Sequence, residues 1–286
     1  MSYSLRVLNV TLQQSFGFAR LIVMENKEES NKNELVQALF SVGAHFGYAR
    51  SRRHPSVTPY IFGVKNQVEI FDLEKTLTLL EKAKMFVRKT AQSRGQMLFV
   101  SGKKEAEALI KKIALELEMP YVAGRWIGGT LTNFAEIRKR VDRLLDLISK
   151  RDKGELAKYT KKERLLLDRE IVNLERFFGG IVPMKQLPKV LFVIDPRKET
   201  TAITEAQKNK IPVIALSGSD CDVSKIEYPI VGNDGAMASI RYFLEEIAGA
   251  YKEGLMQIEE KAGEMKTALP TMAETAPEKG DVKAGI

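Results

Sequence analysis

Short apolar runs alternate with amphipathic stretches through most of this chain, and that alternation restricts its fold more than any other feature. The runs QMLFVSG, KVLFVID and IPVIAL are apolar at consecutive positions rather than at every second one. Strands buried on both faces of a sheet have this pattern. Helical periodicity separates them, over about residues 73–93, 103–118, 200–208 and 236–257. The order predicts a doubly wound α/β domain, with a mostly parallel sheet between two helical layers.

Shorter elements complete the predicted domain. ELVQALFSVGAHFG indicates a helix that ends at the loop from Gly43 to Gly47. YIFGVKNQVEIFDL indicates two strand pieces around a turn at Lys65 and Asn66, and YVAG and YPIVG indicate two further strands.

Between Phe134 and Gly179 the strand-helix alternation stops. Two apolar stripes at 3 and 4 spacing flank KRDKGELAKYTKK, one from Ile137 to Ile148 and one from Leu167 to Phe178. They predict an inserted antiparallel helical hairpin over 134–179, within a discontinuous core of 33–133 and 180–257. Residues 1–32 are expected to be a flexible extension with a second candidate start at Met24. Residues 258–286 are expected to be a disordered tail, because they lack an apolar period.

Composition favours a negatively charged partner inside the cell. Lys and Arg number 45 against 37 Asp and Glu, a formal charge of +8, and such an excess favours polyanions. The single cysteine, Cys221, excludes a disulfide within the chain and suits a reducing compartment. No apolar run approaches the roughly 20 residues that span a bilayer. We therefore expect a cytoplasmic protein without a membrane partner.

The motifs give little support to an enzyme. SGKK at Ser101 to Lys104 resembles a phosphate-binding turn, but GxxxxGK[ST] and GxGxxG are absent. Asp195, Asp220, Asp222 and Asp234 follow predicted strands, where carboxylates serve as catalytic groups or hard-cation ligands but more often close turns. We expect no catalytic residue, no metal site, no cofactor and no small-molecule substrate. The enzyme alternative would use Lys103, Asp195 and Asp220 on a phosphorylated substrate.

Cations and one aromatic on loops containing Gly and Pro point instead to RNA. Phosphate contacts from Lys and Arg give sequence-independent affinity, and aromatic rings stack on exposed bases. The segment GRWIGGTLTNF has two interpretations: Arg125 and Trp126 dock RNA, or Trp126 packs in the core while Thr132 or Asn133 caps a helix. The predicted RNA contacts, including cations of the hairpin, are Arg50, Arg52, Arg53, His54, Lys65, Lys103, Lys104, Arg125, Trp126, Arg138, Lys139, Arg140 and Arg143.

Several long motifs resemble the family of bacterial-type small-subunit ribosomal protein two. They are LFSVGAHFG, PYIFGVKN, RWIGGTLTNF, PKVLFVIDPRKETTAITEAQKNKIP and PIVGND, within residues 34–257. The resemblance implies a flavodoxin-like three-layer core with an inserted coiled-coil hairpin. It also implies a structural protein that binds small-subunit ribosomal RNA near the junction of head and body. The implied partners are neighbouring ribosomal proteins, including small-subunit ribosomal protein one in bacteria. A third interpretation, compatible with this one, makes the hairpin a protein-interaction arm.

Overall fold

The central feature of the fold is a sheet of five parallel strands. The computed structural model describes residues 32–267, so the predicted extension before residue 32 and the tail beyond 267 lie outside it. The strands are β4 (Met97–Ser101), β5 (Tyr121–Ala123), β6 (Val190–Ile194), β7 (Val213–Ser217) and β8 (Tyr228–Val231), in the order β5-β4-β6-β7-β8. This is the strand order of the flavodoxin-like doubly wound fold.

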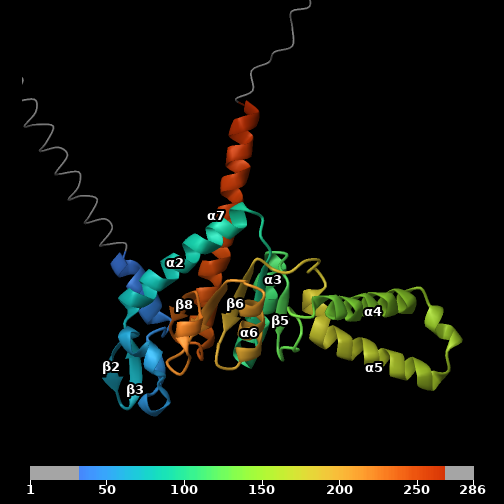
Figure 1. The fold of residues 1–286 in the computed structure, drawn as a ribbon, viewed down its shortest axis with the longest axis horizontal. Coiled ribbons are helices and arrows are strands. Elements are labelled where there is room, and N and C mark those ends of the chain that lie inside the picture. The colour runs from blue at the N-terminus through green and yellow to red at the C-terminus, as the bar shows by residue number, and fades with distance from the viewer. Residues whose placement is uncertain (1–31, 268–286) are drawn as a thin grey trace, which may run out of the picture.

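Helices cover both faces of this sheet, which gives three layers (Figure 1). Successive residues of a strand point to opposite faces, and the core divides accordingly. In β4, Met97 and Phe99 pack in one apolar cluster with α2 (Leu73–Gln92), α3 (Lys104–Glu116) and α7 (Met237–Thr267). Leu98 and Val100 pack in the other with α6 (Thr200–Lys208). Every residue of β4, β6 and β7 is buried, as their apolar sequences predicted.

A small antiparallel sheet stands beside the parallel one. It has the order β1-β3-β2, with β1 (Phe46–Ala49), β2 (Ile61–Lys65) and β3 (Val68–Phe71). Asn66 and Gln67 form the β2–β3 turn, one residue beyond the predicted position, and both have positive φ, as tight hairpin turns often require. Two 3-10 helices, η1 (Arg50–Arg52) and η2 (Pro55–Tyr60), connect β1 to β2.

The hairpin region contains α4 (Phe134–Asp152), η3 (Glu155–Lys158) and α5 (Lys161–Phe178). The two long helices lie side by side and project from the β5 side of the sheet (Figure 1). Their outer parts pack through a separate cluster of Leu144, Leu147 and Ile171. Their inner ends belong to the sheet's own core, where Ile137, Val141 and Phe178 pack with Leu98, Val100 and their neighbours.

Three differences from the sequence-based expectations concern short or terminal elements. Strand β1 was missed. Its four residues, FGYA, do not alternate between buried and exposed positions, so the sequence carries no period-two pattern there. Asn133 precedes α4 without a side-chain capping bond. Helix α7 continues to Thr267, ten residues beyond the predicted end of the folded core at Gln257. None of the described helices combines the length and apolar character needed to span a membrane.

Candidate nucleic-acid interface

Lys103 is a buried cation at the carboxyl end of β4. Its ammonium lies 2.6 Å from a carboxylate oxygen of Asp234 and 3.1 Å from one of Asp195, and it donates to the hydroxyl of Tyr48 at 3.2 Å. The side chain is only 5% exposed. Burial lowers the pKa of Lys103, but the two carboxylates outweigh that effect and leave the pKa raised. Lys103 was predicted to contact RNA, but here its ammonium is buried and paired with Asp195 and Asp234, so the structure does not offer it to a phosphate.

At the same edge, the aspartates that the enzyme alternative considered are already paired within the protein. Atoms of Asp195, Cys221 and Asp234 lie within 4.8 Å of one another, as metal ligands would, but the ammonium of Lys103 already holds both carboxylates. Burial, with the nearby carboxylates, raises the pKa of the Cys221 thiol, which keeps it protonated and a poor ligand. Ligands of α/β sheets usually bind at this edge, and here the protein's own side chains fill it.

The turn that resembled a phosphate site is also filled from within. The carboxylate of Glu199 lies against Gly102, so close that a Cβ at this position would clash with it. Burial and the neighbouring Asp195 raise the pKa of Glu199 to about 7. A protein carboxylate thus occupies the place that the sequence analysis considered for a phosphate.

The loop after β5 wraps around one carboxylate, that of Glu205 on α6. Glu205 accepts the indole N–H of Trp126 at 3.1 Å and the backbone N–H groups of Gly129 at 2.8 Å and Leu131 at 2.9 Å. The indole is 8% exposed and packs in the core. Of the two interpretations of Trp126, the buried position and the internal hydrogen bond match packing rather than an RNA contact. The adjacent Arg125 is exposed.

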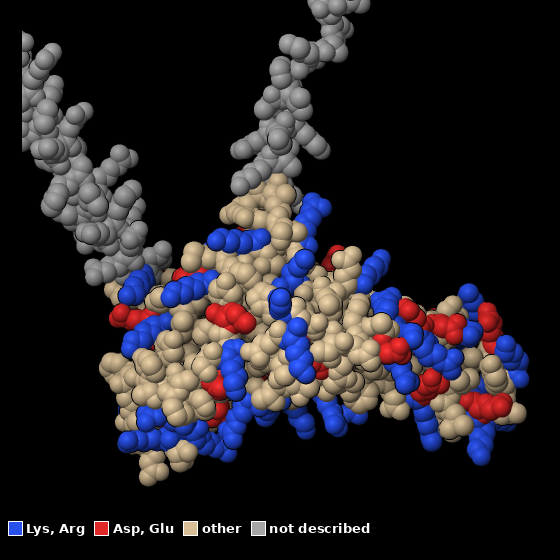
Figure 2. All heavy atoms as spheres, viewed as in Figure 1, with Lys and Arg blue, Asp and Glu red and all other residues tan. Residues whose placement is uncertain are grey.

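Five exposed cations are distributed along the edge where β4 and β5 end and where the small sheet lies. Within the described part of the chain, none of the five forms an ion pair with an acidic side chain. Lys and Arg side chains gather along the corresponding lower rim of the molecule in Figure 2. We call this set the basic rim; it consists of Arg50, Arg52, Lys65, Lys104 and Arg125.

Backbone contacts fix the segment that carries the first of these cations. The backbone N–H of Arg50 donates to Gln67 at 3.1 Å, and that of His54 donates to the carbonyl of Ser219 at 2.9 Å. Arg53 lies 3.5 Å from the buried carboxylate of Glu69. Burial raises the pKa of Glu69, an effect that Arg53 partly opposes. Arg53 and His54 are half-buried and therefore hold the loop, whereas Arg50 extends to solvent.

The predicted hairpin cations differ in their availability. Arg138 donates to the carbonyl of Val182 at 3.2 Å and pairs with Asp142. Lys139 pairs with Glu136, and Arg143 pairs with Glu170. Arg140 is exposed and has no ion pair among the described residues. Of these four, only Arg140 has the features of the basic rim.

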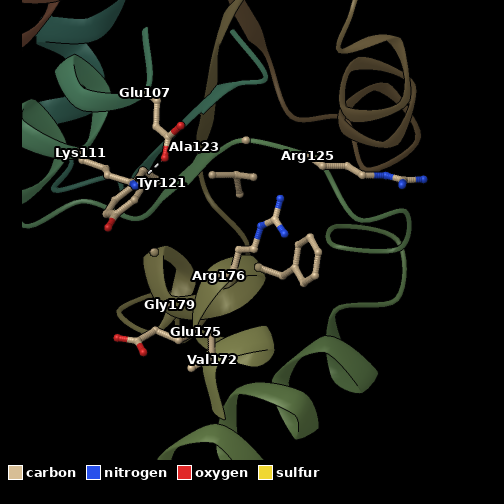
Figure 3. Close-up of a pocket in the computed structure, with 13 residues that line it drawn as sticks. Glu107, Lys111, Tyr121, Ala123, Arg125, Val172, Glu175, Arg176 and Gly179 are labelled. Atoms are coloured by element: carbon tan, nitrogen blue, oxygen red, sulfur yellow. Dashed lines mark hydrogen bonds and ion pairs between the residues drawn. The ribbon is translucent and has the colours of Figure 1, made fainter. Parts of the chain in front are cut away.

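Sequence reasoning missed two exposed cations near the predicted ones. Lys198 follows β6 at the same edge, and its position in DPRKE after an apolar strand was the available signal. Arg176 lies at the end of α5, its guanidinium 5.4 Å from the centre of the Phe177 ring. It lines a cleft of about 590 Å³ between α3, β5 and α5. Figure 3 shows Arg176 pointing into this cleft and Arg125 extending away from it.

The fold and its filled ligand edge define the class as an α/β protein with a basic surface. The family model described as Ribosomal protein S2 matches residues 39–254. The chain belongs to this family, as its motifs predicted, and the family is not enzymatic.

Relatives named Small ribosomal subunit protein uS2 agree over most of their length. The one from Roseiflexus sp. (strain RS-1) is 45% identical over 219 residues, which cover 77% of this chain and 84% of the relative. The one from Chloroflexus aurantiacus (strain ATCC 29366 / DSM 635 / J-10-fl) is 42% identical over 219 residues, 77% of this chain and 92% of the relative. The one from Geotalea uraniireducens (strain Rf4) is 43% identical over 222 residues, 78% and 87%.

Proposed function

We propose that this protein is a structural constituent of the small ribosomal subunit and binds small-subunit ribosomal RNA near the junction of head and body. The family membership supports the ribosomal role. The observation that carries the RNA contact is the basic rim, whose cations lack acidic partners within the described residues. Unpaired Lys and Arg side chains lose little when they bind phosphates, because no internal ion pair has to break.

In the same proposal the protein is bound to the ribosome in the cytoplasm and docks neighbouring ribosomal proteins, with small-subunit ribosomal protein one among them in bacteria. The arm of α4 and α5 would act as a coiled coil in this docking. Leu165 and Val172 on α5 expose apolar side chains to solvent. Burial of these side chains against a protein neighbour would be favourable, which supports a protein contact on the arm.

Sedimentation of a tagged copy from lysate tests the ribosomal role. We expect the protein to migrate with the small subunit at low salt and to leave it at high salt, because phosphate contacts weaken as salt rises. A protein that sediments alone at low salt, while other small-subunit proteins comigrate with the subunit, would contradict the proposal.

A further inference from the structure

A small cavity lies next to the basic loop, between α6 and the segment that follows β7. It has a volume of about 270 Å³. Pro196, Ile203 and Ile226 provide apolar wall, and Thr200 and Thr204 add hydroxyl groups. Gln207 closes one side by donating its side-chain amide to the carbonyl of Lys225 at 2.8 Å. None of these residues has a part in the ion cluster around Lys103 or in the loop around Glu205.

The charges at the mouth of this cavity balance one another. Arg197 pairs with Asp220, and Lys225 lies 3.2 Å from Asp222. His54 also lies at the mouth, with its Nδ1 3.9 Å from Asp222. A phosphate entering here would displace paired carboxylates, so the part of a ligand that enters the cavity should be uncharged.

The position of the cavity links it to the RNA-facing cations. His54 lines the cavity and follows Arg50, Arg52 and Arg53 directly in sequence. The backbone of His54 is bound to Ser219, in the segment that leads to the opposite wall. Arg50 and Arg52 therefore lie within four residues of a side chain that lines the cavity.

We propose that this cavity receives one unstacked nucleobase of the bound RNA. The inference rests on the proposed function. A base is the flat, uncharged part of a nucleotide, and proteins that read single-stranded RNA splay such bases out and pack their faces against side chains. The cavity is smaller than the about 300–1,000 Å³ of typical small-molecule pockets, which suits one ring system and leaves its phosphate outside, on Arg50 or Arg52. The Asp222 carboxylate and the threonine hydroxyls can accept hydrogen bonds from an exocyclic amino group.

Filling the cavity tests the inference. Thr204 is exposed on α6 and lines the cavity, so Thr204→Trp should place an indole where the base would sit. Thr201, on the same helix, is also exposed but does not line the cavity, and Thr201→Trp is the matched control. Thr204→Phe is a smaller second variant, in case the indole disturbs folding. Equal melting temperatures show that the variants compared are folded.

The measurement is filter retention of full-length small-subunit ribosomal RNA over a series of salt concentrations. We expect Thr204→Trp to bind about tenfold more weakly than Thr201→Trp, equivalent to about 1.4 kcal/mol, as loss of one stacked base predicts. The slope of log affinity against log salt should stay unchanged, because no phosphate contact is lost.

Each other outcome overturns the inference in a recognisable way. Equal affinity of the two variants means that no base enters. Weaker binding with a shallower salt slope means that a phosphate lies there instead. Normal RNA binding with poorer incorporation into subunits means that the cavity receives a side chain of a protein neighbour. If the wild-type chain itself shows no salt-dependent affinity for the RNA, the proposed RNA contact fails, and the inference fails with it.

Discussion

The carboxylate of Glu205 accepts the indole N–H of Trp126 at 3.1 Å, which joins the loop after β5 to a helix 79 residues further along the chain. The backbone N–H groups of Gly129, Leu131 and Thr132 donate to the same carboxylate. A sequence motif that combines an arginine, a tryptophan and glycines is thus organised by an acidic residue outside it. Arg125, beside Trp126, stays free to face solvent.

Glu205→Gln should destabilise the protein more at neutral pH than at acid pH. Burial alone would raise the pKa of Glu205, but the hydrogen bonds from Leu131, Gly129 and Trp126 leave it lowered. A lowered carboxyl pKa contributes stability that is present above the unfolded value of about 4.5 and is lost as pH falls through the folded value. Urea unfolding at pH 7 and pH 3.5 measures this; a difference between variant and wild type that is equal at both pH values would contradict it.

Trp126→Ala should cost roughly 3–5 kcal/mol of unfolding free energy, the usual effect of emptying a large core site. Arg125→Ala should leave the melting temperature unchanged but weaken RNA binding and lower the salt slope by about one phosphate contact. Together the two variants separate packing from RNA contact within one loop. Wild-type affinity and slope for Arg125→Ala would remove this residue from the basic rim.

Lys103→Met should destabilise the protein by about 3–5 kcal/mol, because it leaves two carboxylates buried without their cation. Lys104→Met is the matched control: it removes the same charge from an exposed position that has no ion pair among the described residues. Its stability should stay within about 0.5 kcal/mol of wild type. Lys104→Met should instead lower the salt slope of RNA binding. Similar stability of the two variants would show that the cluster around Lys103 is not structural.

These two lysines illustrate what the sequence could and could not predict. Apolar runs such as VLFVI have no polar face, so the strands they form must be buried on both sides of the sheet. The local sequence pattern therefore predicted β4, β6 and β7. Lys103 and Lys104 are chemically identical neighbours, and only the turn into α3 decides which one points into the core. Glu205 had no signal near the loop that it organises, because its partners lie more than 70 residues away. Contacts of that range depend on the assembled layers rather than on local pattern.

Glu199 should make the wild-type protein less stable at pH 8 than at pH 5. Burial, then the charge of Asp195, raises its pKa to about 7, from an ordinary value of 4.5. A raised carboxyl pKa means that the folded state binds the proton more tightly, so stability falls as pH rises from about 4.5 to about 7 and is constant above. Glu199→Gln should reduce this decrease, although the raised pKa of Glu69 remains, and should raise the free energy of unfolding at pH 8 by on the order of 2–3 kcal/mol. Asp168→Asn, at an exposed position of α5, should keep the wild-type pH profile; a profile unaltered by Glu199→Gln would refute the assignment.

The arm should be removable only beyond the point where it joins the core. Leu144, Leu147 and Ile171 pack with one another outside the sheet's core, whereas Ile137, Val141 and Phe178 pack inside it. Replacing residues 144–171 with a Gly/Ser linker of about six residues, long enough to join two packed helices, should leave cooperative unfolding of the core intact. Replacing all of residues 134–179 should cost several kcal/mol, because large core side chains are lost with it. Circular dichroism during urea unfolding distinguishes these results. The shorter deletion should still weaken incorporation into the small subunit, since it removes Arg164 and Arg169 together with the exposed Leu165. If the shorter deletion abolishes the cooperative transition, the outer arm is part of the core after all.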